Sequence, residues 1–112
     1  MFGAKKKARG GAFSFRVSDV VEVPLRGTLL RLRLVDGSPS MGDLAPGARL
    51  RLVSPGGAER EVSIDAHAVT GGAATQERLD RTRELDVVIG AAAAGGVPVE
   101  IGWSATGPVD GA

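Results

Sequence analysis

Few residues in this chain could support catalysis. His67 is the one histidine and there is no cysteine, so a zinc site would depend almost wholly on carboxylates. A serine triad would also need His67, and no G-x-S-x-G motif surrounds any serine. No G-x-x-x-x-G-K-S/T loop is present to hold a nucleotide phosphate. The sequence therefore predicts no enzyme, no metal site, no cofactor and no bound nucleotide, and it places His67 on the surface.

Four further residues could be assigned either a chemical or a structural role. Asp19 could be mistaken for a catalytic carboxylate, but we expect it to accept backbone N–H bonds where the first strand bends. Trp103 could be a stacking platform, but its place in an alternating apolar pattern favours the core. Gly27 and Thr28 close a predicted turn, where a glycine permits a positive φ. We therefore interpret Asp19, Gly27 and Thr28 as structural turn residues.

Arginines offer the strongest binding chemistry in the chain, because a guanidinium group can hold phosphate oxygens in pairs. Four of them alternate with apolar residues in two segments, and a fifth lies in a turn: Arg31, Arg33, Arg49, Arg51 and Arg26. If the two segments are neighbouring strands, the first four share one outer face. Such a face is a candidate contact for phosphate groups or for a partner. The favoured interpretation is a salt-bridged surface, since acidic residues lie on nearby strands at Asp19, Glu22, Glu59 and Glu61.

Residues 1–12 are predicted to form a flexible basic arm. Four cations lie in its first ten positions: Lys5, Lys6, Lys7 and Arg9. They are four of the fourteen basic residues, which leaves ten to set against thirteen acidic residues in the rest of the chain. Gly10-Gly11 then makes a loose link to Phe13. The arm is either a contact for nucleic acid or another anionic surface, or a solubilising tail.

Short strands are the elements that must position these side chains. Apolar residues recur at every second position, which is typical of a strand with one buried face. The inward residues of the first five expected strands are Phe13, Phe15 and Val17; Leu30, Leu32 and Leu34; Leu50 and Leu52; Val62, Ile64, Ala66 and Ala68; and Leu85, Val87 and Ile89. Turn signals separate the strands, as at Pro24-Leu25-Arg26-Gly27 and Ser54-Pro55-Gly56-Gly57.

Two segments near the end of the chain carry weaker patterns. Residues 70–84 are predicted to be a loop with at most one or two helical turns, capped by Thr75, because Leu79 is almost the only apolar residue there. The last strand is expected to point Val97, Val99, Ile101 and Trp103 inward. Residues 107–112 are expected to form a flexible tail.

The whole pattern predicts one all-β domain. A chain of 112 residues is one domain by its length, and its core must be aliphatic because it has no tyrosine, one tryptophan and three phenylalanines. Six alternating strands with little helix indicate a single closed or nearly closed antiparallel barrel. Closure would hide the strand edges that a flat sheet exposes.

A longer motif runs from Phe13 to Asp43. It reads F-x-F-x-V-x-D-V-x-x-V-P-x-R-G-T, followed by a strand and a glycine-aspartate pair, and it includes Asp19-Val20, Pro24, Arg26-Gly27-Thr28, Gly37 and Gly42. This order closely resembles the start of the second domain of elongation factor Tu and related translation GTPases. Leu25 and Leu32 depart from the family, which commonly has glycine at both positions. The resemblance implies a six-stranded Greek-key barrel over residues 13–106, of a kind that contacts ribosomal RNA and the acceptor end of aminoacyl-tRNA.

Two functions follow as expectations. The first is a stand-alone barrel without a GTPase domain that acts as a protein-interaction or scaffold module for an unidentified protein partner. The alternative is an RNA- or ribosome-associated accessory factor that uses the basic arm and the arginine face. No apolar stretch approaches the roughly 20 residues of a membrane span, and no secretory signal opens the chain. With no cysteine in the chain, we expect a cytoplasmic protein.

Overall fold

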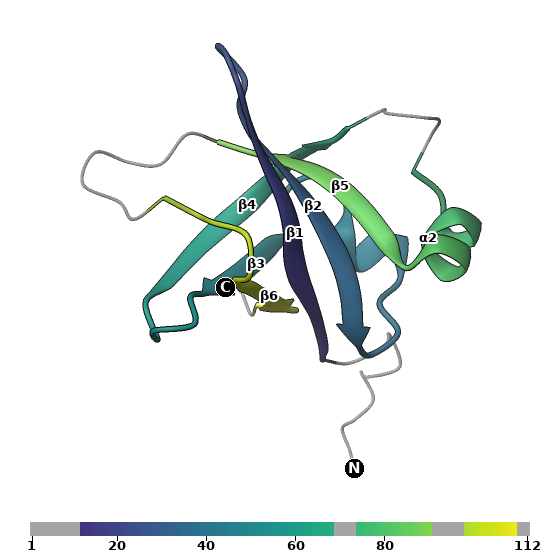
Figure 1. Cartoon of the computed structure of the whole chain (residues 1–112). Coiled ribbons are helices and arrows are strands. Elements are labelled where there is room, and N and C mark those ends of the chain that lie inside the picture. Colours follow the sequence, from purple (N-terminus) through teal and green to yellow (C-terminus); the bar gives the residue numbers. More distant parts are fainter. Residues whose placement is uncertain (1–11, 69–73, 91–97, 110–112) are drawn as a thin grey trace.

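The computed structural model describes residues 12–68, 74–90 and 98–109. Within these ranges the chain forms six strands and two short helices (Figure 1). In chain order they are β1 Phe13–Val23, β2 Gly27–Asp36, the 3-10 helix η1 Met41–Leu44, β3 Arg49–Val53, β4 Glu59–His67, α2 Gln76–Thr82, β5 Glu84–Ile89 and β6 Ser104–Gly107. The predicted all-β class is confirmed.

The strands close into a ring in the order β1-β2-β5-β4-β3-β6. All of the pairings are antiparallel. The strands β3, β4 and β5 are neighbours both in sequence and in the ring, whereas β2 lies beside β5. The connection from β2 to β3 therefore passes over two strands, which is the Greek-key arrangement. The predicted closed antiparallel barrel is confirmed.

One continuous apolar core fills the ring. The inward positions expected for the first three strands, for β5 and for Trp103 are all buried. Phe13 and Phe15 pack edge to face with their ring centroids 5.6 Å apart, a favourable aromatic geometry. Leu44 from η1 and Leu79 from α2 are also buried in this cluster. The two helices thus cover parts of the core that the strands leave open.

The alternation predicted for β4 fails near its end. Val62 and Ile64 are buried, but the ladder to β5 shifts between Ile64 and Ala66. Such a bulge reverses the inward and outward positions that follow it. As a result Ala66 pairs with Val88 and is exposed. The prediction that Ala66 points into the core is wrong, and Ala68 is only half-buried.

The last strand begins later than predicted. Val97 of the predicted strand lies outside the described residues. Residues 98–103 form no strand, and β6 starts at Ser104. A turn occupies Ile101 and Gly102, with Gly102 at φ 99°, so Ile101 is 64% exposed and the prediction that it points inward is wrong. The inward residues of β6 are instead small: Ala105 and Gly107 are buried. The barrel therefore includes Gly107, one residue beyond its predicted end.

The helix α2 occupies the segment where one or two helical turns are predicted. The Thr75 side chain accepts a hydrogen bond from the Arg78 backbone N–H, which caps the first turn as expected. The helix ends at Arg83, whose φ of 60° is left-handed and whose N–H donates to the Leu79 carbonyl. Residues 70–73 of the predicted segment lie outside the described residues.

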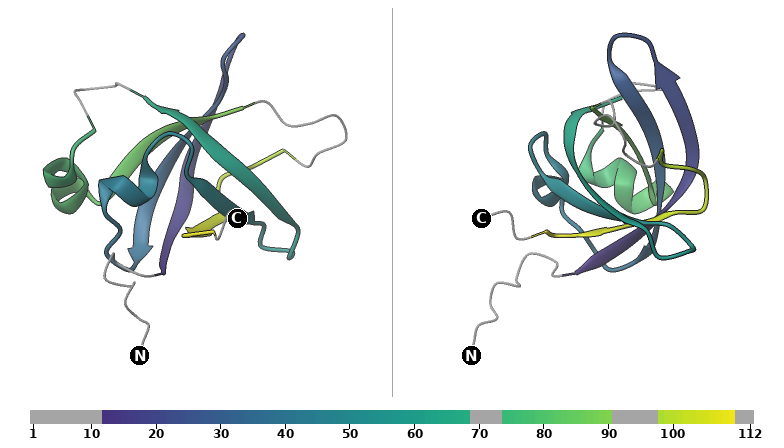
Figure 2. Two further views of the ribbon diagram at one scale, coloured as in Figure 1. Left: turned by 180° about the vertical axis from the view of Figure 1, so that it is seen from behind. Right: turned by 90° about the vertical axis from the view of Figure 1, so that its left-hand side faces the viewer.

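The β1–β2 hairpin projects beyond the ring at one end (Figure 2). Its turn spans Val23 to Arg26, and the Arg26 N–H donates to the Val23 carbonyl at 3.0 Å. Pro24 takes the second position and Leu25 the third, where φ is 67°. A proline followed by a positive φ is the pattern of a type II turn, which favours glycine at the third position. Here a leucine occupies it.

Candidate functional site

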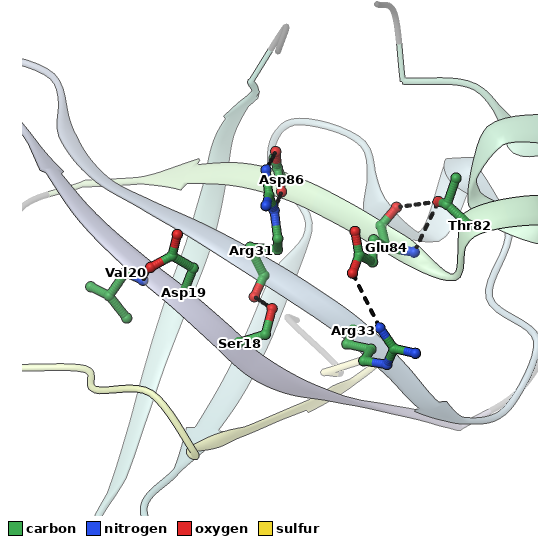
Figure 3. Close-up of polar contacts among 8 residues, drawn as sticks. All are labelled: Ser18, Asp19, Val20, Arg31, Arg33, Thr82, Glu84 and Asp86. Carbon is green, nitrogen blue, oxygen red and sulfur yellow. Dashed lines mark hydrogen bonds and ion pairs between the residues drawn. The ribbon is translucent and has the colours of Figure 1, made fainter. Parts of the chain in front are cut away.

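Arg31 and Arg33 on β2 are engaged by carboxylates of the neighbouring strand β5 (Figure 3). Arg31 holds Asp86 through two parallel bonds, Nε to Oδ1 at 3.0 Å and Nη2 to Oδ2 at 3.1 Å. Arg33 contacts Glu84 through a single bond of 3.3 Å. The hydrogen bond to Asp86, followed by the charge of Asp86, raises the pKa of Arg31 above its ordinary value. These contacts occupy both guanidinium groups.

Arg49 and Arg51 on β3 are also paired with acidic residues. Glu61 on β4 accepts from Arg49 at 2.7 Å and from Arg51 at 3.3 Å, and Glu59 lies 3.9 Å from Arg51. In the ring β5 and β4 separate β2 from β3. The predicted single face of four arginines is therefore wrong, because its premise of neighbouring strands fails. Both pairs of arginines are salt-bridged, but only Glu59 and Glu61 of the carboxylates predicted for this role take part, and Asp86 and Glu84 serve on β5 instead.

The remaining basic candidates do not join either pair. Arg26 is exposed in the turn between β1 and β2, and the hairpin formed by these two strands projects from the molecule (Figure 1). The arm residues Lys5, Lys6, Lys7 and Arg9 lie outside the described residues. The predicted basic residues therefore do not come together as one surface within the part of the chain that the structure describes.

The three predicted turn residues lie in or beside the projecting hairpin. Asp19 follows a bulge in β1, and its Oδ1 accepts from the Val20 backbone N–H at 3.0 Å (Figure 3). Gly27 has φ 121°, and a side chain there would collide with the Ile89 carbonyl. Thr28 is buried and its Oγ1 lies 3.4 Å from a Glu22 carboxylate oxygen. All three act on backbone geometry or local bonding.

His67 is not an ordinary surface residue. It is half-buried, and its Nε2 lies 2.7 Å from the Leu44 carbonyl oxygen. The contact fastens η1 to β4, so it is structural. Among the described residues no group of three His, Cys, Asp or Glu side chains could hold a metal ion. Nor does any described helix have the length and apolar character needed to cross a bilayer.

The largest anomaly on the described surface is Leu25. Its side chain is fully exposed at the hairpin tip, and its backbone has the left-handed φ of 67°. A non-glycine residue in this conformation costs about 1 kcal/mol or more. A surface hollow of about 490 Å³ adjoins the turn and is lined by residues 22–27. The sequence held a signal for this feature, namely a leucine where the turn favours glycine.

No protein-family model matches the chain, and no curated protein matches it significantly.

Proposed function

We propose that this protein is a non-catalytic, stand-alone β-barrel related to the second domain of translation GTPases, and that it acts as a protein-interaction or scaffold module. The single observation that carries the proposal is Leu25, an exposed leucine in a strained turn at the projecting hairpin tip. The residue adds nothing to the packing of its own fold, and an apolar side chain at the end of a projecting hairpin can enter a pocket of a protein partner.

Three further features support a protein partner. The four arginines on β2 and β3 are paired with carboxylates, which reduces their value for phosphate binding; they are Arg31, Arg33, Arg49 and Arg51. The chain contains no phosphate-binding loop, so the resemblance extends to the barrel half of the translation factors and not to their GTPase half. Among the described residues, no group of His, Cys, Asp or Glu side chains could hold a metal ion.

The proposal is tested by co-purification with the tagged full chain from native lysate, treated with ribonuclease. We expect a recurrent protein partner that is retained by the wild type and lost with Leu25→Ser. A partner recovered equally with Leu25→Ser, or no recurrent protein at all, would contradict the proposal. Arg26→Ser at the same tip serves as the control, because it alters an exposed side chain of the turn without removing the apolar contact.

A second candidate function rests on the basic arm. Four cations in the first ten residues favour an RNA or ribosome contact. Binding through phosphates weakens steeply with salt. We therefore compare RNA and ribosome binding of the full chain and of a variant lacking residues 1–10 at about 50 mM and about 200 mM salt. Binding that is strong at low salt, falls steeply and is lost with the deletion would favour this function over the protein module.

A further inference from the structure

β1 is paired along one side for nearly its whole length but along the other side for less than half of it. β2 pairs with it from Ser14 to Val23. β6 pairs with it only from Phe13 to Arg16. The last contacts on that side are the Val17 N–H to the Trp103 carbonyl at 2.8 Å and the Gly102 N–H to the Val17 carbonyl at 2.9 Å. Within the described residues, no strand lies beside this edge beyond Val17.

The backbone groups of this edge can be assigned from the pairing. Asp19, Val21 and Val23 alternate with Val20 and Glu22 along the ladder to β2. The Val23 carbonyl accepts within the hairpin turn, so Val23 and Val21 direct their groups toward β2. The Val20 N–H instead bonds the Asp19 carboxylate. Because alternate residues of a strand direct their N–H and C=O groups to the same side, Glu22 presents its N–H and C=O at the open edge.

We propose that this open edge, from Ser18 to Val23, binds an extended basic segment of a partner protein as an added β-strand. The edge offers backbone donors and acceptors in strand geometry, and that is the recognition chemistry of strand addition. The open edge begins where the pairing of β1 on this side ends, at the contact between Val17 and Trp103. The inference rests on the proposed function, since it names the class of partner that the module binds.

The charge of the edge selects the occupant. Asp19 covers the first free donor on the outer face, and Glu22 adds a second carboxylate on the opposite face, where it accepts from Thr28 Oγ1 at 3.4 Å. The nearest described cation to Asp19 in the ladder is Arg31, which is already held by Asp86. A lysine or arginine on an incoming strand draws the Asp19 carboxylate away and releases the Val20 N–H. A segment without cations leaves that donor blocked.

The same charges disfavour a second copy of this chain. Pairing two copies along this edge would bring Asp19 and Glu22 of each close to the like charges of the other, and like charges across a strand pair are destabilising. The bulge before Asp19 and the proline after Val23 also limit the edge to a short stretch. Charges, bulges and prolines of this kind prevent an exposed strand edge from pairing with strands of unrelated chains. They leave a short site that a complementary segment can occupy.

Exposed apolar side chains adjoin the edge at three points. Val21 is 45% exposed on the strand itself, Leu25 is fully exposed at the tip, and Ile101 is 64% exposed beside Gly102. An added strand carries side chains on alternate faces. A lysine that faces Asp19 therefore shares its face with Val21, and the apolar residues of an alternating segment lie on the other face, beside Val20, which packs against the core.

The test uses the isotopically labelled full chain and a capped synthetic peptide that alternates lysine and valine. We expect the peptide to shift the amide resonances of residues 18–23 and to slow hydrogen exchange at the Glu22 amide by about tenfold or more. A peptide that alternates glutamate and valine is the control and should not bind. Absence of binding at millimolar peptide, or shifts confined to other strands, would overturn the proposal.

Two variants separate the backbone from the charge. Glu22→Pro removes the outward N–H without removing a backbone bond to β2, and like Glu22→Ala it loses the side-chain contact with Thr28. We therefore expect about tenfold weaker binding of the lysine–valine peptide. Glu22→Ala keeps the N–H and should lose only about threefold. Equal affinities for the two would contradict strand addition. If Glu22→Pro fails to fold, Asp19→Lys keeps every backbone group and uncovers the Val20 N–H, and it should bind the glutamate–valine peptide in preference to the lysine–valine one.

Failure of this inference can be told from failure of the proposed function. A partner from lysate that is lost with Leu25→Ser but retained by Glu22→Pro leaves the interaction module in place and overturns the open edge as its site. Sedimentation that shows a dimer of the wild type and a monomer of Glu22→Pro would assign the edge to a second copy, which overturns the choice of a basic partner segment.

Discussion

Leu25 occupies a backbone position that normally belongs to glycine, and this makes its replacement informative. Leu25→Gly removes a strain of about 1 kcal/mol or more, which outweighs the entropy that glycine gains in the unfolded chain. We expect the free energy of unfolding in urea to rise by about 0.5 kcal/mol. Leu25→Val should lower it by about 1 kcal/mol, because a branched side chain tolerates positive φ poorly. A large loss with Leu25→Gly would show that the leucine packs against its own fold.

Gly27 and Gly47 share a positive φ but differ in their surroundings. A side chain at Gly27 meets the Ile89 carbonyl, whereas one at Gly47 meets no atom within 4 Å. Gly27→Ala should therefore cost about 3 kcal/mol, from backbone strain and a forced shift of β5. Gly47→Ala should cost about 1 kcal/mol from strain alone. Calorimetry of both variants checks the difference, and equal losses would contradict the close approach of β5.

The roles of some residues can be predicted from their neighbours in the sequence, and those of others cannot. Trp103 and Thr75 have the core and capping roles predicted from their neighbours in sequence. His67 could not be assigned in the same way, because its partner Leu44 is 23 residues away along the chain. Likewise the exposure of Leu25 follows from a hairpin that projects from a ring, which local sequence does not describe.

The ladder between β2 and β5 carries two ion pairs of different quality. Arg31 makes two bonds to Asp86, whose side chain is only 12% exposed, while Arg33 makes one bond between more exposed groups. Arg31→Lys keeps the charge but loses the paired geometry, so we expect a loss of about 0.5–1 kcal/mol. Arg33→Lys should change the stability by less than about 0.3 kcal/mol. Parallel denaturation curves measure both, and the reverse order would contradict this ranking.

Strands were predictable where apolar residues occupy every second position without interruption. The residues buried on β2 and β5 alternate without interruption, and they follow directly from the sequence. The bulge before Ala66 and the turn at Ile101 break that period. Both features depend on which strand lies alongside, and neither Ala66 nor Ile101 differs in type from a core residue. The inward residues of β6 were missed for a related reason, since Ala105 and Gly107 carry too little apolar surface to mark a strand.

At the scale of the whole molecule, one interior receives side chains from every strand. Val17 is fully buried whereas Ile101 is 64% exposed. Val17→Asp places an unpaired carboxylate in the aliphatic core and should abolish cooperative folding. Ile101→Asp should change stability by less than about 0.5 kcal/mol. Circular dichroism and thermal unfolding distinguish the two, and an unfolded Ile101→Asp would show that the turn before β6 is misplaced.

The order of strands in the ring is the property that the sequence predicted least well. A closed antiparallel barrel follows from alternation and length, but the arginine face required β2 and β3 to be adjacent. The Greek-key connection separates them by two strands. Neighbours in a ring are decided by long-range packing, and no residue in either segment specifies its distance from the other.

The ring is completed by its shortest member. β6 has four residues, three of which pair with β3, and Gly107 contributes no side chain to the core. Hydrogen exchange reports local opening, and regions with few buried contacts open first. We therefore expect the amides of β6 to exchange earlier than those of β2 and β5 under native conditions. The barrel would then open reversibly at β6 into a curved sheet, while β2 and β5 stay paired on the opposite side.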